Sequence, residues 1–175
     1  MKKMMLIISV LLLFMSACSE IDSSTDSLPE YTNLEKLDAN YKIEDAITDN
    51  CVVFNDSALV FGQDIWNVFL ATIEESKSCS VRIARYYSVE DALYLIDVSY
   101  DGAYKINTND GDSRQYSYLK HYEFERDSAN EESSIIDCYL LINQEDVTYE
   151  EIERSMASSI AGDAIDHYIL YYDVS

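Results

Sequence analysis

The sequence predicts an α+β protein, with an antiparallel sheet of about five or six strands and two or three helices packed on it. Three observations lead to this class. Polar and apolar residues alternate with a period of two through most of residues 80–125, as in strands that bury one face. Tight-turn signals such as Asp101-Gly102 follow individual strands, as antiparallel hairpins require. Two other segments repeat apolar residues at helical spacing, so helices should cover the sheet.

The first half of the folded region should contain a short helix, a hairpin and a longer helix. Residues 41–49 place their apolar side chains on one side of a short helix. Apolar runs at 51–54 and 58–61 flank Asn-Asp-Ser, which predicts a small hairpin. Residues 63–76, which follow Gly62, predict an amphipathic helix because their apolar residues form one stripe. That stripe consists of Ile65, Trp66, Phe69, Leu70 and Ile73.

Strands dominate the second half. The expected strands cover residues 80–86, 92–100, 103–108, 114–125, 135–143 and 165–172. Residues 135–143 are apolar on both faces, which indicates a central strand. Thr148 and Glu151 form a capping box that begins a second helix. We expect this helix at 149–161, with Gly162 as its C-cap.

The chain has 175 residues, of which 48% are apolar, so we expect one folded domain with an extension. The predicted organisation is a signal peptide at 1–17, a lipidated N-terminus and solvated tether at 18–40, and a single α+β domain at 41–175.

The extreme N-terminus has the layout of a bacterial secretory signal. Lys2 and Lys3 precede an almost purely apolar run, Met4–Met15. The segment Met15-Ser16-Ala17-Cys18 at the end of this run resembles a lipobox, in which the cysteine is acylated and becomes the new N-terminus. An uncleaved anchor is disfavoured because the run is shorter than the roughly 20 residues of a bilayer span. A buried core helix is disfavoured by the terminal position behind two lysines.

Acylation of Cys18 would place the protein on the extracytoplasmic face of the cell membrane, because two or more acyl chains give stable anchoring. Its contact with the membrane would be the lipid itself.

The charge excludes one class of partner. There are 33 acidic and 12 basic residues, and removing the two signal lysines leaves a formal charge of −23. A nucleic-acid partner is therefore excluded, since binding its phosphates needs a basic surface. Electrostatic docking on anionic lipid is disfavoured for the same reason.

Three cysteines follow Cys18, namely Cys51, Cys79 and Cys138, and each lies in an apolar, strand-like run. The favoured interpretation is small buried hydrophobic residues. One disulfide with an undefined pairing, or a catalytic thiol, is an alternative. Their spacing is not that of a metal site, and we predict neither a metal nor a cofactor.

Five segments within residues 41–172 together carry a resemblance to known proteins. They are YKIEDAITDNCVVF, GQDIWNVFL, VRIARYYSVEDALYLIDVSYDG, RQYSYLKHYEFE and DVTYEEIERSMASSIAGDAIDHYILYY. As a set they resemble small uncharacterised lipoproteins of Gram-positive, clostridia-like bacteria. The resemblance implies a surface lipoprotein with a compact domain. That family has no assigned reaction or ligand, so it implies no residue roles.

The candidate site residues are histidines and tyrosines in predicted strands. If their strands paired, His121 and His167 could share a face and, with a carboxylate, bind a metal or perform acid–base work. Tyr116, Tyr118 and Tyr122 have even spacing, which predicts a shared face that could bind sugars or peptide. The alternative is that these tyrosines simply cover the core.

The sequence therefore favours a non-enzymatic binding or interaction module of the bacterial envelope, with an envelope protein, a peptide or a glycan as its partner. The alternative is a small envelope hydrolase or metal-dependent enzyme that uses His121 or His167.

Overall fold

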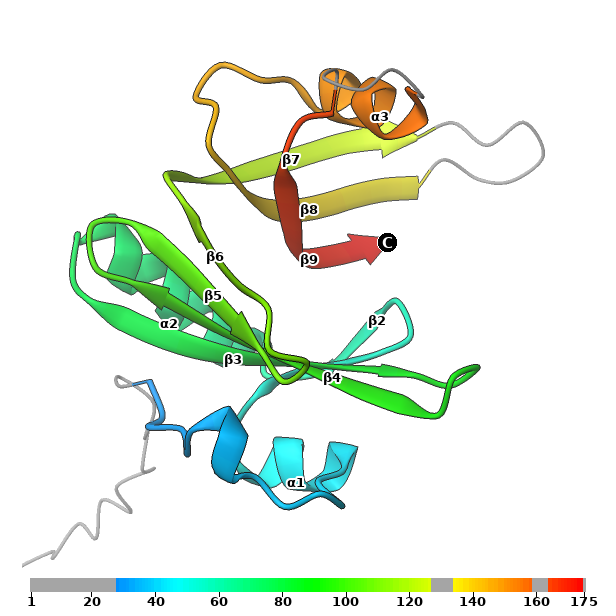
Figure 1. The fold of residues 1–175 in the computed structure, drawn as a ribbon. Helices are drawn as coiled ribbons and strands as arrows, with labels where there is room; N and C mark the ends of the chain where they lie inside the picture. Colours follow the sequence, from blue (N-terminus) through cyan, green and yellow to red (C-terminus); the bar gives the residue numbers. More distant parts are fainter. Residues whose placement is uncertain (1–27, 127–133, 159–163, 175) are drawn as a thin grey trace, which may run out of the picture.

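A computed structural model describes residues 28–126, 134–158 and 164–174, and it confirms the α+β class (Figure 1). The helices are α1 (Ile43–Thr48), α2 (Gln63–Glu74) and α3 (Tyr149–Ala157), preceded by the short 3-10 helix η1 (Leu34–Lys36). The strands are β1 (Val52–Asn55), β2 (Ala58–Phe61), β3 (Cys79–Tyr87), β4 (Ala92–Tyr100), β5 (Tyr104–Thr108), β6 (Ser113–Tyr116), β7 (Tyr118–Arg126), β8 (Ser134–Ile142) and β9 (His167–Val174).

The strands form two sheets rather than the single sheet expected from the sequence. The larger has the order β2-β1-β3-β4-β5-β6 and the smaller the order β7-β8-β9. All pairs are antiparallel except β1 and β3, which run parallel with Val52 opposite Ile83. The helix α2 separates the β1–β2 hairpin from β3, and a helical connection permits the parallel pairing that a tight turn forbids.

The two sheets separate in the middle of the segment 114–125, which the sequence predicts as one strand. Its residues belong to β6 in the larger sheet and β7 in the smaller one. At Ser117, between them, the backbone N–H donates to Asn143 Oδ1 at 3.0 Å. Because the period-two alternation continues across Ser117, the pattern by itself does not reveal the change of sheet.

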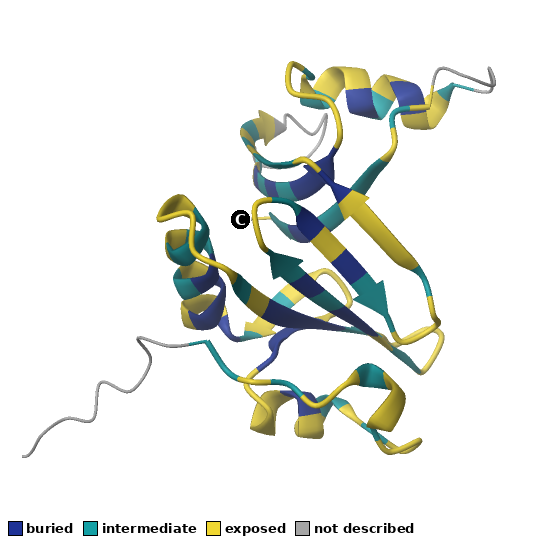
Figure 2. Ribbon diagram, turned by 60° about the vertical axis from the view of Figure 1, so that its left-hand side comes forward, coloured by how far each residue is buried: buried dark blue, intermediate teal, exposed yellow. Residues whose placement is uncertain are grey.

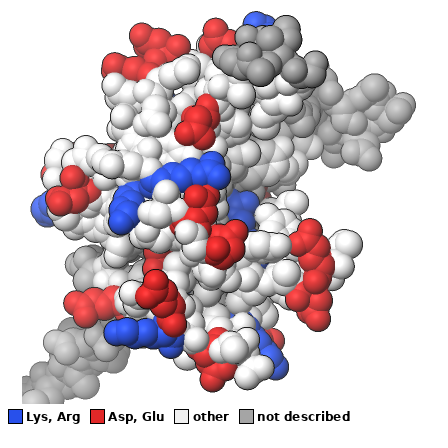
Figure 3. Space-filling model, in the orientation of Figure 1, with Lys and Arg blue, Asp and Glu red and all other residues white. Residues whose placement is uncertain are grey.

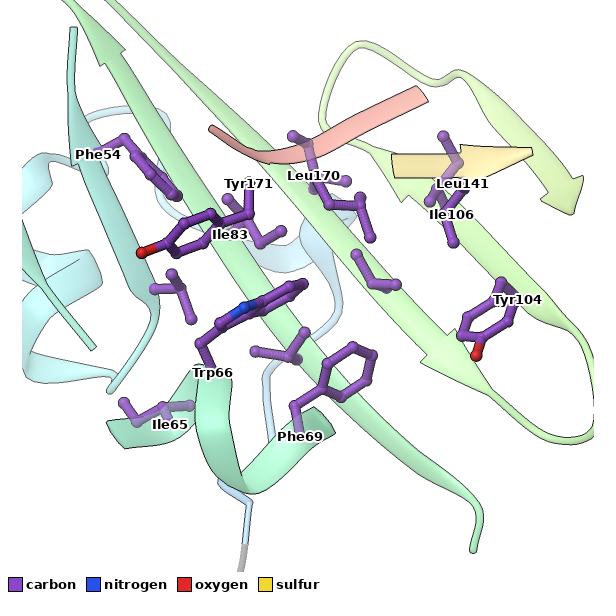
Figure 4. Close-up of a cluster of buried hydrophobic side chains, with 14 of the residues drawn as sticks. Phe54, Ile65, Trp66, Phe69, Ile83, Tyr104, Ile106, Leu141, Leu170 and Tyr171 are labelled. Atoms are coloured by element: carbon purple, nitrogen blue, oxygen red, sulfur yellow. The ribbon is translucent and has the colours of Figure 1, made fainter. Parts of the chain in front are cut away.

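The main core lies between the two sheets and α2 (Figure 4). Trp66 from α2 stacks on Tyr171 from β9 with ring centroids 5.5 Å apart, and Phe54 from β1 meets Tyr171 edge-on at 5.4 Å. All three side chains are buried, and burial of a large apolar side chain contributes about 1.5–3 kcal/mol. This layer holds the two sheets together. In Figure 2, many of the buried residues lie on the strands that face this core.

The opposite face of the larger sheet is covered by the segment that leads into α1. Leu28 packs on the main core, and Tyr31, Leu34 and Leu37 pack on the outer face of the sheet. The packed part of the chain thus begins at least as early as Leu28, before the boundary at residue 41 that the sequence suggested. The apolar spacing of these residues is irregular, so it did not indicate an element.

The smaller sheet is covered on its outer face by α3, whose Ile152 is fully buried there. The predicted capping box is confirmed, since Thr148 Oγ1 accepts from the N–H of Glu151, and Glu151 accepts from that of Thr148. The helix ends at Ala157, earlier than expected, and the predicted cap at Gly162 lies outside the described residues.

Gly62 allows the chain to turn from β2 into α2. Its φ is +88°, a region that favours glycine, and a Cβ there would lie 2.7 Å from the carbonyl oxygen of Cys51. Within the described ranges, no helix is long and apolar enough to cross a membrane. The signal region and Cys18 lie outside those ranges.

Candidate functional site

The two histidines do not come together. His121 in β7 and His167 in β9 both pair with β8, where they lie opposite Tyr139 and Ile142 respectively. Residues an odd number of positions apart on a strand point to opposite faces. The two histidines therefore lie on opposite faces of the smaller sheet, and the shared site considered from the sequence does not form.

His121 forms a surface pair with a carboxylate. Its Nε2 lies 2.8 Å from Asp137 Oδ1, and its ring stacks on Tyr139 with centroids 4.1 Å apart. The two side chains are 43% and 38% exposed. Across the described residues, no group of three or more His, Cys, Asp or Glu side chains is arranged to hold a metal ion.

The three predicted tyrosines do not share a face either. Tyr116 is buried in the main core, where its hydroxyl lies 3.4 Å from Asp166 Oδ1. Tyr118 and Tyr122 lie in the other sheet and pack on the α3 side. Their hydroxyls donate to Glu145 and to the carbonyl of Val147. The change of sheet at Ser117 causes this separation.

A different set of tyrosines lines a groove at the junction of the two sheets. Two adjoining cavities, of about 560 and 290 Å³, share Arg85, Tyr87 and Tyr168 as lining residues, and we call them together the inter-sheet groove. The larger cavity is also lined by Phe54, Asp56, Ser57, His167, Ile169 and Tyr172. The smaller is also lined by Glu90, Tyr94 and Ile96.

Strand register places these side chains together. Arg85 and Tyr87 alternate on β3 and so point to the same face. Arg85 pairs with Phe54 on β1 and with Tyr94 on β4. The rings of Tyr87 and Tyr94 meet edge-on, with centroids 5.5 Å apart. The edge strand β9 supplies the opposite wall.

Arg85 ties the two sheets together at a β-bulge. The register of β8 and β9 shifts so that Leu170 is an extra residue in β9. Arg85 Nη2 donates to the carbonyls of Leu170 at 2.8 Å and Ile169 at 3.2 Å, and the guanidinium lies 5.1 Å from the Phe54 ring centroid. Its Nη1 makes no hydrogen bond within the described part of the chain, so it can donate to a ligand.

His167 supplies a second group, its Nε2, that has no hydrogen-bond partner in the described parts of the chain. Its Nδ1 lies 2.8 Å from the carbonyl oxygen of Ile165. Because a carbonyl only accepts, Nδ1 carries the proton, and Nε2 of the neutral ring is then an acceptor. His167 is thus the one predicted site residue that lines the groove.

Three tyrosine hydroxyls in the groove are also free. Those of Tyr87, Tyr168 and Tyr172 make no hydrogen bond to the described residues. Burial raises the pKa of Tyr168, so its hydroxyl remains protonated at neutral pH and can donate.

A cavity of about 690 Å³ beneath the N-terminal segment is larger than either cavity of the groove taken alone, but its side chains leave fewer groups without a hydrogen-bond partner among the described residues. Its tyrosine hydroxyls are already engaged: that of Tyr41 donates to Asp49 and that of Tyr86 donates to Asp91. The inter-sheet groove is therefore the better candidate for a ligand site.

The charge of the groove is close to neutral. Asp56 accepts from the N–H and hydroxyl of Ser88, and Glu90 accepts from Tyr94 at 3.0 Å. With Arg85, these carboxylates give a formal charge of −1. Acidic side chains are also spread over the face of the molecule seen in Figure 3.

The three described cysteines are free thiols, so no disulfide joins them. Burial raises the pKa of Cys51 to about 12 and those of Cys79 and Cys138 to about 11. The thiolate is the reactive form, and it is scarce at neutral pH in all three. Cys51 and Cys138 are buried, as predicted, whereas Cys79 is only half-buried.

Comparison with protein-family models, with curated proteins and with solved structures gives no match to the chain. The chemistry of the site is therefore argued from the residues of this chain.

Proposed function

We propose that the protein is a lipid-anchored, extracytoplasmic binding module of the bacterial envelope, without enzymatic activity, and that its inter-sheet groove binds a glycan. The carrying observation is that several hydrogen-bonding groups with no partner among the described residues converge between aromatic side chains. These groups are the hydroxyls of Tyr87, Tyr168 and Tyr172, Nη1 of Arg85 and Nε2 of His167.

Sugars match this combination. Each ring hydroxyl both donates and accepts, and the groove offers donors, an acceptor and tyrosine hydroxyls that do both. The C–H faces of a sugar ring pack against aromatic planes, and tyrosine combines such a plane with a polar group. A peptide would be held by apolar pockets, whereas the aliphatic lining of the groove is limited to Ile96 and Ile169.

Support for the anchor comes from the apolar run and Cys18 in the sequence. A glycan on the cell surface or in the cell wall would then be within reach of the domain. The resemblance to clostridia-like lipoproteins agrees with this location.

The test is direct binding by the full chain in a detergent that has no sugar headgroup. Calorimetry against neutral glycans, acidic glycans and peptides should give binding of a glycan. Tyr172→Ala should weaken that binding at least tenfold, and Tyr86→Ala should not, because Tyr86 points to the opposite face of β3. Binding of peptides alone would refute the glycan, and unchanged binding by Tyr172→Ala would refute the groove.

One observation favours the alternative of a small envelope hydrolase. The His121–Asp137 pair has the contact that orients an imidazole as a general base. Hydrolysis of an envelope ester or glycoside by the full chain, lost in His121→Ala and in Asp137→Asn, would support this function.

A further inference from the structure

The two cavities of the inter-sheet groove form one elongated site. Arg85, Tyr87 and Tyr168 line both of them, so a ligand can pass from one to the other across these side chains. The larger cavity alone lies in the 300–1,000 Å³ range of sites for drug-sized ligands, which are roughly as large as two or three sugar rings. A single sugar would leave most of the groove empty.

Aromatic rings are present along the whole length. Tyr172 lines only the larger cavity, Tyr94 lines only the smaller one, and Tyr87 and Tyr168 lie between them. The ring planes of Tyr87 and Tyr94 are 74° apart, so one flat ring cannot stack on both. Two linked rings, tilted relative to each other, can each use one of these planes.

The charges disfavour an ionised ligand. Asp56 lines the larger cavity, Glu90 lines the smaller one and Arg85 lines both, so a carboxylate bound at Arg85 would share its cavity with a like charge. The mature chain, with a formal charge of −23, repels anions at longer range as well. The guanidinium of Arg85, which lines both cavities, repels a cation at the junction, although the two carboxylates give the groove as a whole a formal charge of −1.

We infer that the ligand is an uncharged oligosaccharide of at least two sugar units that spans both cavities, an inference that rests on the proposed function. Tyr172 defines a subsite in the larger cavity, and Tyr94 defines a second subsite in the smaller one. Arg85 donates from Nη1 to a sugar oxygen at the junction.

The experiment measures affinity against chain length. Calorimetry of the full chain without substitutions would use the one- to four-unit members of three neutral series, namely cello-, malto- and fully N-acetylated chito-oligosaccharides. Oligogalacturonate would serve as the charged probe. In the series that binds, affinity should rise at least tenfold from one unit to three. The charged oligomer should bind less tightly than neutral ones of equal length.

Variants then assign the subsites. Tyr94→Ala should reduce trisaccharide affinity to the level of the monosaccharide and leave monosaccharide binding unchanged. Tyr172→Ala should weaken binding at every length. Tyr86 lies on the other face of the same hairpin, so Tyr86→Ala should change neither the monosaccharide affinity nor the trisaccharide affinity.

The possible failures are distinct. Equal affinity for one and three units, or preference for the charged oligomer, would overturn this inference while leaving glycan binding intact. Absence of binding to any glycan, with peptide binding present, would overturn the proposed function itself. The length series needs no variant, so poor folding of a mutant does not affect it.

Discussion

Arg82 and Arg85 lie three residues apart on β3, on opposite faces of the larger sheet, and they have different surroundings. Arg82 is fully buried on the outer face and makes two hydrogen bonds to Asp97, at 2.6 and 2.8 Å. It also donates to the carbonyl of Thr32, and the Tyr31 ring lies 5.0 Å away. Arg85 is only partly buried and bonds two carbonyls through one nitrogen.

The difference separates a structural arginine from a candidate binding arginine. Arg82 lies between a carboxylate and the N-terminal segment, so its charge is compensated; its Nη1 has no hydrogen-bond partner among the described residues, but it is buried and does not line the groove. Arg85 fixes the bulge in β9 and also lines a groove in which, among the described residues, its Nη1 and three tyrosine hydroxyls have no hydrogen-bond partner. A cation with a compensated charge stabilises a fold, whereas one with an unused donor in a cavity can also bind a ligand.

The largest expected effect concerns Arg82, the fully buried arginine of this comparison. Asp97→Ala leaves the buried guanidinium of Arg82 without its counter-charge. We expect the free energy of unfolding to fall by about 3 kcal/mol, measured by urea denaturation. As a control, Asp112→Ala in the exposed pair with Arg114 should cost no more than about 0.5 kcal/mol. Equal effects of the two substitutions would contradict the structural role of Asp97.

The next substitution tests the double role of Arg85. Arg85→Ala removes the donor from two main-chain carbonyls, and we expect a loss of about 2 kcal/mol in unfolding free energy. It should also weaken glycan binding. Arg85→Lys should restore part of the stability, since an ammonium can reach one carbonyl but lacks the second arm. If the alanine variant is as stable as the parent, the bulge carbonyls do not depend on Arg85.

The closed outer face also predicts a pH dependence. Burial raises the pKa of Cys51 from 9.0 to about 12, so the folded state retains this proton more tightly than the unfolded state. The stability from this difference is complete below about pH 9 and is lost as the pH rises towards 12. The gap in unfolding free energy between the parent and Cys51→Ala should narrow by about 1 kcal/mol between about pH 8 and pH 10. A constant gap over this range, in parallel denaturation curves, would show that the thiol titrates normally in the fold.

The smallest expected effect concerns the groove that Arg85 lines. Tyr87→Phe removes one free hydroxyl but keeps the ring, so stability should change by less than about 0.5 kcal/mol. Affinity for the neutral trisaccharide should fall about fivefold, the equivalent of one net hydrogen bond. Tyr86→Phe is the matched control because its hydroxyl bonds Asp91 on the other face. Equal affinities of the two variants would mean that the Tyr87 hydroxyl does not contact the ligand.

Local sequence patterns determined much of the secondary structure. The α2 stripe, the β1–β2 hairpin, the central position of β8 and the capping box of α3 are all confirmed. Each depends on residues within a few positions of one another, where spacing and turn chemistry act directly. The sequence also marked the strands as rich in tyrosine, and it includes His167 of the groove among its candidates. The lipid anchor on Cys18 stays a prediction.

Only the tertiary structure decided how the strands combine. Period-two alternation shows which residues of a strand share a face, but not which strand lies beside it. That is why the division at Ser117 and the separation of Tyr116 from Tyr118 and Tyr122 could not be foreseen. The groove joins Arg85 to the carbonyl of Leu170, 85 positions away. Such a contact depends on the packing of two sheets around one core, so the site emerges only when the whole chain has folded.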